Sequence, residues 1–133
     1  MIFKSSGKLV YNPKTHLRDS ERWLVLMVEE ELSLYYRCLF RREFFWKPKL
    51  QRPVWGSHVS IVRGEKIPNV DAWGFAANKT INFEYEPGVS SNGEYYWLKV
   101  YCDELAAIRE LFGLPREPRF GFHLTIGRTT ADV

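Results

Sequence analysis

Two histidines in this sequence stand in the same local pattern. Residues 56–61 read Gly, Ser, His, Val, Ser, Ile, and residues 121–126 read Gly, Phe, His, Leu, Thr, Ile. Because side chains alternate across a β-strand, His58 and Ser60 share one face in the first copy, as do His123 and Thr125 in the second. Each copy therefore predicts a strand with an apolar face for the core and an imidazole and a hydroxyl on the opposite face.

Two histidines that face each other across a cleft can divide acid–base work. The unperturbed imidazole pKa of about 6.5 lets one be neutral while the other is protonated near neutral pH. One then takes a proton and the other gives one, as in-line attack at a phosphodiester requires. Ser60 and Thr125 can donate hydrogen bonds to the non-bridging phosphate oxygens as charge builds on them. This chemistry needs no metal ion, so we expect no metal and no other cofactor.

Other roles for these residues stay open. A strand histidine is often structural, but chance would give two of the three histidines a hydroxyl two residues later in only a few per cent of cases, roughly. The third histidine, His16, has no such neighbour. Zinc is a further alternative, although no acidic third ligand sits at a fixed short spacing and the hydroxyls would be unexplained. A nucleotide-binding module without catalysis is the remaining alternative.

Composition limits the architecture. A chain of 133 residues that is 45% hydrophobic is long enough for one core, so we expect a single domain over residues 1–133. The net charge of +3 fits an anionic ligand, and a solvated basic surface explains it equally well. Cys38 and Cys102 form neither a disulfide framework nor a CxxC site, and we expect both as buried free thiols. The apolar run at 23–28 is too short to span a bilayer, and the N-terminus lacks a signal-peptide core, so we expect a cytoplasmic protein without membrane contact.

The elements that must position the two motifs follow from periodicity and turn residues. A continuous apolar run predicts a covered strand at 23–28, and helical spacing with acidic residues first and basic residues last predicts a helix that ends before Pro48. Asp103 as N-cap, with Gly113 and Pro115 beyond the end, predicts a helix over 104–112. Further strands are expected at 8–11, 57–62, 80–85 and 94–101, with Pro87 and Gly88 ending the strand at 80–85.

In order, these elements give strand, helix and repeat strand twice, with a hairpin between the two units. The sequence therefore predicts an α+β fold. We expect a single bilobal domain of two pseudo-two-fold related strand–helix–strand units, with helices outside and a concave, antiparallel-rich sheet cleft. Within each unit, the crossover helix is expected to join neighbouring parallel strands. Both histidine–hydroxyl pairs would then face each other in the cleft.

The paired motifs resemble the 2H phosphoesterases, a family defined by two His-apolar-Ser/Thr motifs on a duplicated α+β fold. His58-Val59-Ser60 and His123-Leu124-Thr125 match both motifs, and the order of elements matches over roughly residues 23–128. The resemblance implies that the two histidines are acid and base and that the two hydroxyls hold the phosphate. Members of the family cleave RNA-type phosphodiesters or cyclic phosphates without metal. The small size is most similar to compact phage-type members such as anti-CBASS nucleases.

Residues that contact the substrate are predicted from their types and places. Nucleobases stack on aromatic rings, and Tyr11, Trp55 and Trp73 fall near strand ends or loops that could rim the cleft, although a core role suits the tryptophans equally well. Arg63 and Arg128 each follow their histidine by five residues and could offer positive charge to phosphate, whereas solvated strand-end arginines are the usual finding.

These expectations give a metal-independent phosphodiesterase that cleaves 3′–5′ bonds of cyclic oligonucleotide signals. One alternative is a 2′,3′-cyclic phosphodiesterase that acts on RNA ends, and the other is the binding module without catalysis. The partner would be a cyclic oligonucleotide or another RNA-type phosphodiester, in the host cytoplasm if the protein is phage-encoded. Which histidine is the acid, which base is preferred and which oligomer forms are left open.

Overall fold

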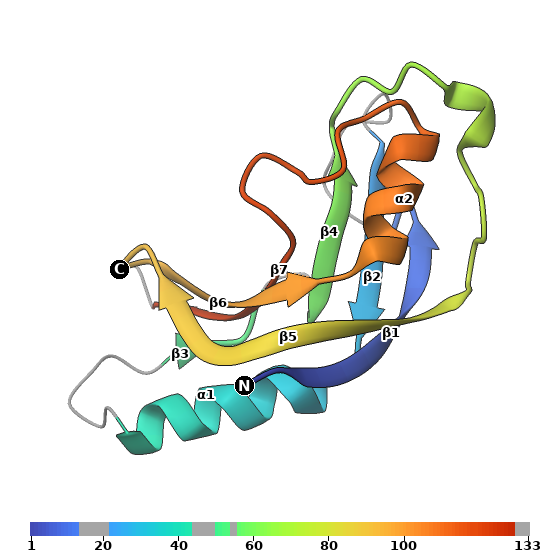
Figure 1. The fold of residues 1–133 in the computed structure, drawn as a ribbon. Helices are drawn as coiled ribbons and strands as arrows, with labels where there is room; N and C mark the ends of the chain where they lie inside the picture. Colours follow the sequence, from blue (N-terminus) through green and yellow to red (C-terminus); the bar gives the residue numbers. More distant parts are fainter. Residues whose placement is uncertain (14–21, 44–49, 54–55, 130–133) are drawn as a thin grey trace.

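The computed structural model describes residues 1–13, 22–43, 50–53 and 56–129 (Figure 1). His16 and Trp55 lie outside these residues. Along the described chain the elements are β1 (Phe3–Tyr11), β2 (Trp23–Val28), α1 (Glu30–Glu43), β3 (Leu50–Gln51), β4 (His58–Arg63), a 3₁₀ turn (Val70–Ala72), β5 (Thr80–Ser91), β6 (Tyr95–Tyr101), α2 (Asp103–Leu111) and β7 (His123–Thr129).

The strands form an antiparallel sheet that closes on itself. In the described part of the chain the strand order is β3-β7-β4-β2-β1-β5-β6, and an additional pairing of β7 with β6 closes six of these strands into a barrel. Every recorded strand pair is antiparallel. The α+β class and the predominance of antiparallel pairing are therefore as the sequence predicts.

Two more detailed predictions about the fold are not confirmed. The structure does not confirm a bilobal domain, because β4 and β7 belong to one closed barrel. The prediction of parallel strands on either side of each helix is wrong: β2 pairs with β4, and β6 with β7, in antiparallel fashion. Figure 1 shows the reason for the first pair, since α1 lies beyond the end of β2 and the chain re-enters the sheet from that same end. A parallel pair would instead require the chain to cross back to the start of the strand.

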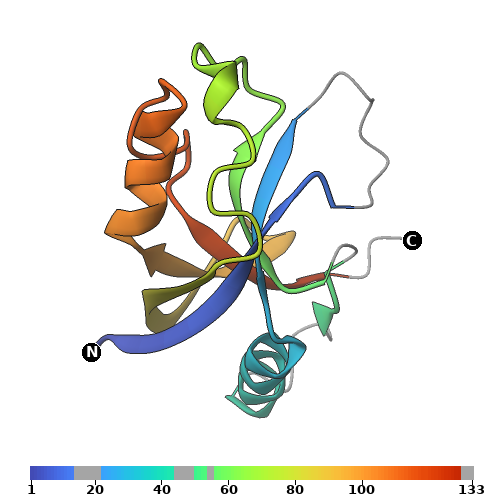
Figure 2. The same ribbon diagram turned by 90° about the vertical axis from the view of Figure 1, so that its right-hand side faces the viewer.

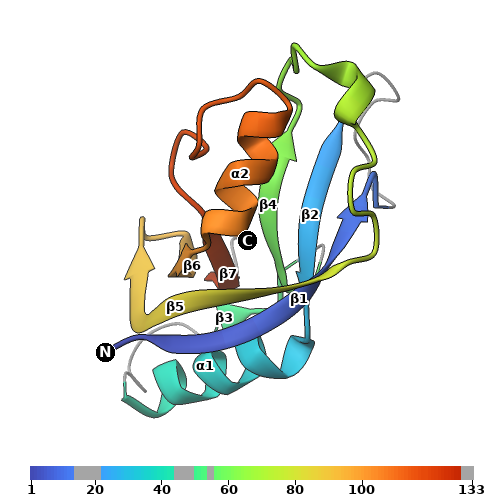
Figure 3. The same ribbon diagram turned by 45° about the vertical axis from the view of Figure 1, so that its right-hand side comes forward.

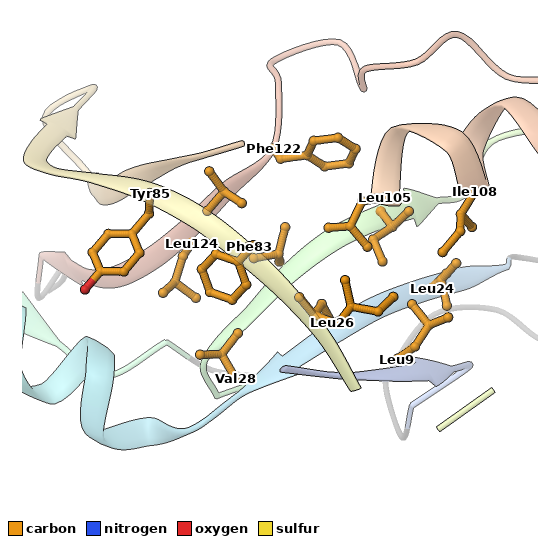
Figure 4. Packing of buried hydrophobic residues seen from close by; sticks show 14 of the residues in the cluster. Leu9, Leu24, Leu26, Val28, Phe83, Tyr85, Leu105, Ile108, Phe122 and Leu124 are labelled. Atoms are coloured by element: carbon orange, nitrogen blue, oxygen red, sulfur yellow. The ribbon is translucent and has the colours of Figure 1, made fainter. Parts of the chain in front are cut away.

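Alternate residues of the strands face one continuous core. Leu9, Leu24, Leu26, Val59 and Leu124 are fully buried, and they belong to one cluster that includes residues of all the long strands and of both helices. In Figure 4, Leu105 and Ile108 of α2 point into this cluster. Figures 2 and 3 show α2 and α1 on either side of the ribbon formed by β1 and β5. The apolar face of each histidine strand is thus anchored in a shared core, which leaves the opposite face for the imidazoles.

Two strands extend beyond their predicted ends. β1 begins at Phe3, five residues before the predicted strand at 8–11, because residues 3–8 pair with β5 and thereby close the barrel. β5 continues through Pro87 and Gly88 to Ser91. Its pairing with β6 is irregular between Tyr85 and Val89, so the proline lies where the ladder is interrupted and its missing N–H costs no regular hydrogen bond.

Two further features can be compared with expectation. Neither helix in the described ranges is long and apolar enough to cross a membrane. Both cysteines are free, but neither is fully buried as expected: Cys38 is exposed on α1, and Cys102 is only partly buried. The helical pattern of residues 30–43 leaves the Cys38 position on the face that is turned away from the sheet.

Candidate active site

One strand pairing brings the two motifs together. Val59 of β4 lies opposite Leu124 of β7 in an antiparallel register. Because antiparallel strands run in opposite directions, this register places His58 across from Thr125 and Ser60 across from His123. Because Val59 and Leu124 are buried in the core, these four polar side chains share the opposite face.

The shared face is hollowed into a cleft of about 570 Å³. All four motif side chains line it, and so do the two arginines that follow the motifs, Arg63 and Arg128. The other lining residues are Pro53, Asn92, Tyr95, Trp97 and Phe120. The cleft has the volume of an ordinary small-ligand site, and the predicted catalytic residues converge in it.

The glycine at the start of each motif holds its histidine. Gly56 and Gly121 have φ values of 78° and 72°, a left-handed conformation that glycine adopts without strain. In each copy the histidine Nδ1 lies within hydrogen-bond distance of the glycine carbonyl oxygen, at 3.0 Å for His58 and 3.2 Å for His123. A carbonyl oxygen only accepts, so Nδ1 carries the hydrogen and donates it. In a neutral imidazole, Nε2 is then the atom that can accept a proton.

The surroundings of His58 disfavour its charged form. Burial lowers the pKa of His58 below its usual 6.5, and the charges of Arg63 and His123 lower it further. The hydrogen bond to Gly56 and the carboxylate of Glu30 act in the opposite direction but do not reverse the shift. His58 is therefore neutral at pH 7, with a fixed tautomer and a basic nitrogen that is available to the cleft.

A tryptophan accompanies each histidine, and the two differ in exposure. The Trp23 ring lies 5.4 Å from the His58 ring in an edge-to-face arrangement, and the Trp97 ring lies 6.0 Å from His123. Trp23 is only 2% exposed, and its Nε1 donates to the Ser60 hydroxyl oxygen at 3.3 Å. Because that hydroxyl already accepts from the indole, its own hydrogen is free to donate to an anion in the cleft.

Helix α1 supports both motifs from the core side. The Glu30 carboxylate accepts a hydrogen bond from the Ser57 backbone N–H at 2.9 Å, directly before His58. One helical turn along, Ser33 hydrogen-bonds to the Ser57 hydroxyl, and Arg37 donates to Ser33 at 3.3 Å. Arg37 also donates to the Ile126 carbonyl oxygen at 2.7 Å. A single helix is thus hydrogen-bonded to both histidine strands.

Helix α2 makes the corresponding contact with the first motif. Arg109 is 1% exposed and donates from Nη1 to the Ile61 carbonyl oxygen at 2.7 Å. Its guanidinium also forms a two-pronged ion pair with Glu65, at 2.7 and 3.0 Å, and its Nε donates to the Pro115 carbonyl. The isoleucine that ends each repeated pattern therefore gives its carbonyl to an arginine from the helix of the other strand–helix–strand unit.

The predicted substrate contacts divide into two groups. Arg63 and Arg128 line the cleft, and the Arg128 Nε is buried without a hydrogen-bond partner among the described residues. Tyr11 and Trp73 do not line it. Their rings pack edge to face at 4.8 Å, both contact Phe112, and the Tyr11 hydroxyl donates to the Phe75 carbonyl. Trp55, the third aromatic residue predicted at the cleft, lies outside the described residues.

Sequence reasoning missed five cleft residues, namely Pro53, Asn92, Tyr95, Trp97 and Phe120. Tyr95 and Trp97 alternate with buried Leu98 and Val100 along β6, so their outward face was readable from period-two alternation. No local signal marks Phe120, which precedes the second motif in an irregular segment. Asn92 sits in the turn between β5 and β6, where turn chemistry alone explains it.

Comparisons with known proteins leave the site to be judged on its own geometry. No family model, no curated protein and no solved structure matches this chain. Among the described residues, no group of three or more histidine, cysteine, aspartate or glutamate side chains is arranged to hold a metal ion.

Proposed function

We propose that this protein is a metal-independent phosphodiesterase that uses His58 as general base and His123 as general acid. The observation that carries the proposal is the convergence of both His–hydroxyl pairs in one cleft. The pairing of Val59 with Leu124 sets both imidazoles on the same face, as acid–base catalysis on a single phosphate requires.

The roles follow from the surroundings of His58. Its lowered pKa and its fixed Nδ1–H leave a neutral imidazole whose Nε2 can remove the proton of a ribose 2′-hydroxyl. The 2′-oxygen then forms a bond to phosphorus while the bond from phosphorus to the 5′-oxygen breaks. His123 gives its proton to that departing oxygen. The products are a 2′,3′-cyclic phosphate and a 5′-hydroxyl, so atoms and charge balance without a metal or an added reactant.

The remaining cleft residues suit the charge that builds on the phosphate. Ser60 has a hydroxyl hydrogen free to donate, because its oxygen accepts from Trp23. Thr125 occupies the matching place in the second motif, and Arg63 and Arg128 bring two positive charges to the same cleft. Donors and cations around non-bridging oxygens stabilise a phosphoryl-transfer transition state more than its ground state.

The substrate we propose is a cyclic oligonucleotide with 3′–5′ linkages. The test is incubation of the purified protein with 3′,3′-cyclic dinucleotides in EDTA, beside linear RNA that ends in a 2′,3′-cyclic phosphate. Turnover of the cyclic dinucleotides supports the proposal, and turnover of the linear ends alone would move the substrate to RNA ends. A 2′-deoxyribose analogue should not be cleaved, because it lacks the attacking oxygen.

Substitution of either catalytic histidine separates catalysis from binding. We expect His58→Ala and His123→Ala each to lower kcat by roughly 10²–10⁴-fold, the usual contribution of general acid–base catalysis. His16→Ala is the matched control, because His16 lacks the repeated pattern, and it should leave kcat within about twofold of wild type. Full activity in either motif variant, or no turnover of any ribonucleotide by wild type, would overturn the proposal.

A further inference from the structure

The two walls of the cleft are built differently. Beside His58, the Trp23 ring is buried and its N–H is committed to Ser60. Beside His123, the equivalent Trp97 ring lines the cleft. Trp97 is paired with Thr125 across the β6–β7 ladder, so its ring belongs to the same side as the second motif.

Three more residues extend this side, and with Trp97 they form what we call the aromatic wall: Asn92, Tyr95, Trp97 and Phe120. Phe120 is 81% exposed although it lies three residues before His123, and Tyr95 is 42% exposed opposite Arg128. The Arg119 guanidinium lies 5.2 Å from the Phe120 ring centre, which gives the exposed ring a cation–π contact. Large aromatic rings left in water beside a catalytic cleft offer the surface on which a nucleobase stacks.

Asn92 adds a polar group to the wall. Its Oδ1 accepts from the backbone N–H groups of Glu94 and Tyr95, at 3.0 and 2.8 Å, which fixes the side-chain amide. No described residue accepts from its Nδ2, so two N–H donors are available to a ligand in the cleft. Ring faces together with an amide donor match a nucleobase, which presents π faces and ring-nitrogen or carbonyl acceptors.

We propose that the aromatic wall binds the base of the leaving-group nucleoside, the one attached to phosphate through its 5′-oxygen. This inference rests on the proposed function, in which His123 protonates that departing oxygen. The leaving nucleoside must then lie on the His123 side of the phosphate, and the aromatic wall is the surface that continues from His123. The attacking nucleoside lies toward His58, where Arg63 and Pro53 line the cleft. The enzyme therefore selects its substrate chiefly by the base on the departing side.

The test uses binding to the catalytically silent variant His58→Ala/His123→Ala, so that it does not depend on turnover. Three ligands are titrated by calorimetry: adenylyl-(3′→5′)-adenosine, and two analogues in which an abasic ribose replaces either the 3′-linked or the 5′-linked adenosine. Adding Phe120→Ala should weaken binding of the two ligands that carry the 5′-linked base by about tenfold, because the ring on which that base stacks is removed. Binding of the ligand without that base should not change.

Phe75→Ala is the matched control. Phe75 is also an exposed phenylalanine, at 52%, but it does not line the cleft. It should leave all three affinities unchanged. A Phe120→Ala effect confined to the 3′-linked base, or an equal effect on all three ligands, would overturn the assignment. Absence of wild-type turnover would overturn the proposed function. A loss of affinity confined to the ligands with the 5′-linked base would still support base binding at the aromatic wall.

Discussion

At the scale of single residues, the acid–base pair depends on the state of His58. Burial, together with the nearby charges of Arg63 and His123, lowers its pKa below 6.5. Only the neutral imidazole can accept a proton, and the carbonyl of Gly56 fixes which nitrogen does so. A histidine with a lowered pKa keeps its basic form into mildly acidic solution, so this residue stays competent as a base where an exposed histidine would be charged.

The pH profile of the reaction should report this shift. Activity of a general base is lost as pH falls through its pKa, so we expect the acidic limb of kcat/KM to lie below pH 6.5. Arg63→Met removes a neighbouring positive charge and should move that limb toward higher pH by less than about one unit. Lys79→Met, which removes an exposed charge paired with Glu104, is the control and should not move it. An acidic limb above pH 6.5 in the wild type would contradict the role of His58.

Residue types and spacing predicted part of the site. Within each motif, the histidine and the hydroxyl residue could be predicted to share a face, because strand alternation is local and does not depend on sheet topology. That the two motifs share one face depends on the pairing of β4 with β7, which has no local signal. Tyr11 and Trp73 could not be placed in the same way, since a position near a strand end does not say which neighbours the barrel brings to it. Phe120 was missed because an irregular segment has no period from which a direction could be inferred.

At the scale of elements, one arginine from each helix connects that helix to a histidine strand. Arg109 of α2 donates to the Ile61 carbonyl and to Glu65, and Arg37 of α1 donates to the Ile126 carbonyl. A main-chain carbonyl has no side-chain freedom. A helix that is hydrogen-bonded to a strand carbonyl therefore fixes the position of that strand relative to the helix. The predicted boundaries of α2 are within one residue of the observed ones, although the N-cap is Cys102 and the predicted cap, Asp103, is the first residue of the helix. The crossed arginine contacts depend on tertiary packing and have no local signal.

Removing one of these arginines should cost stability. Arg109→Met keeps most of the side-chain volume but leaves the Ile61 and Pro115 carbonyls without this donor and Glu65 without its ion-pair partner. We expect the free energy of unfolding, measured in urea, to fall by about 2–4 kcal/mol. Arg116→Met is the control, because the ion pairs of Arg116 with Asp103 and Glu110 are all at the surface, and it should change stability by less than about 1 kcal/mol. Similar losses in both variants would contradict the bracing role of Arg109.

At the scale of the whole molecule, the two histidine strands share one core. The sequence predicts two lobes, because the strand–helix–strand order occurs twice and nothing in either copy states which strands will be neighbours. Pairing is decided by partners far along the chain: β1 joins β2 to β5, and β6 joins β5 to β7. The residues that close this ring form one cluster from Leu9 to Ile126. A single core of this kind should lose its structure in one step.

Cooperative unfolding distinguishes the closed barrel from two separable lobes. We expect one transition in urea, with coincident curves from far-ultraviolet circular dichroism and tryptophan fluorescence. Leu24→Ala in β2 and Leu124→Ala in β7 remove fully buried side chains from opposite strand–helix–strand units, and each should destabilise the whole molecule by about 2–5 kcal/mol. Both probes should shift together at unchanged denaturant dependence. The control, Leu34→Ala, alters a half-exposed residue of α1 and should cost less than about 1 kcal/mol. Two transitions, with each core variant shifting only one, would show that the histidine strands belong to separate folding units, and the cleft between them would then be free to open as those units move.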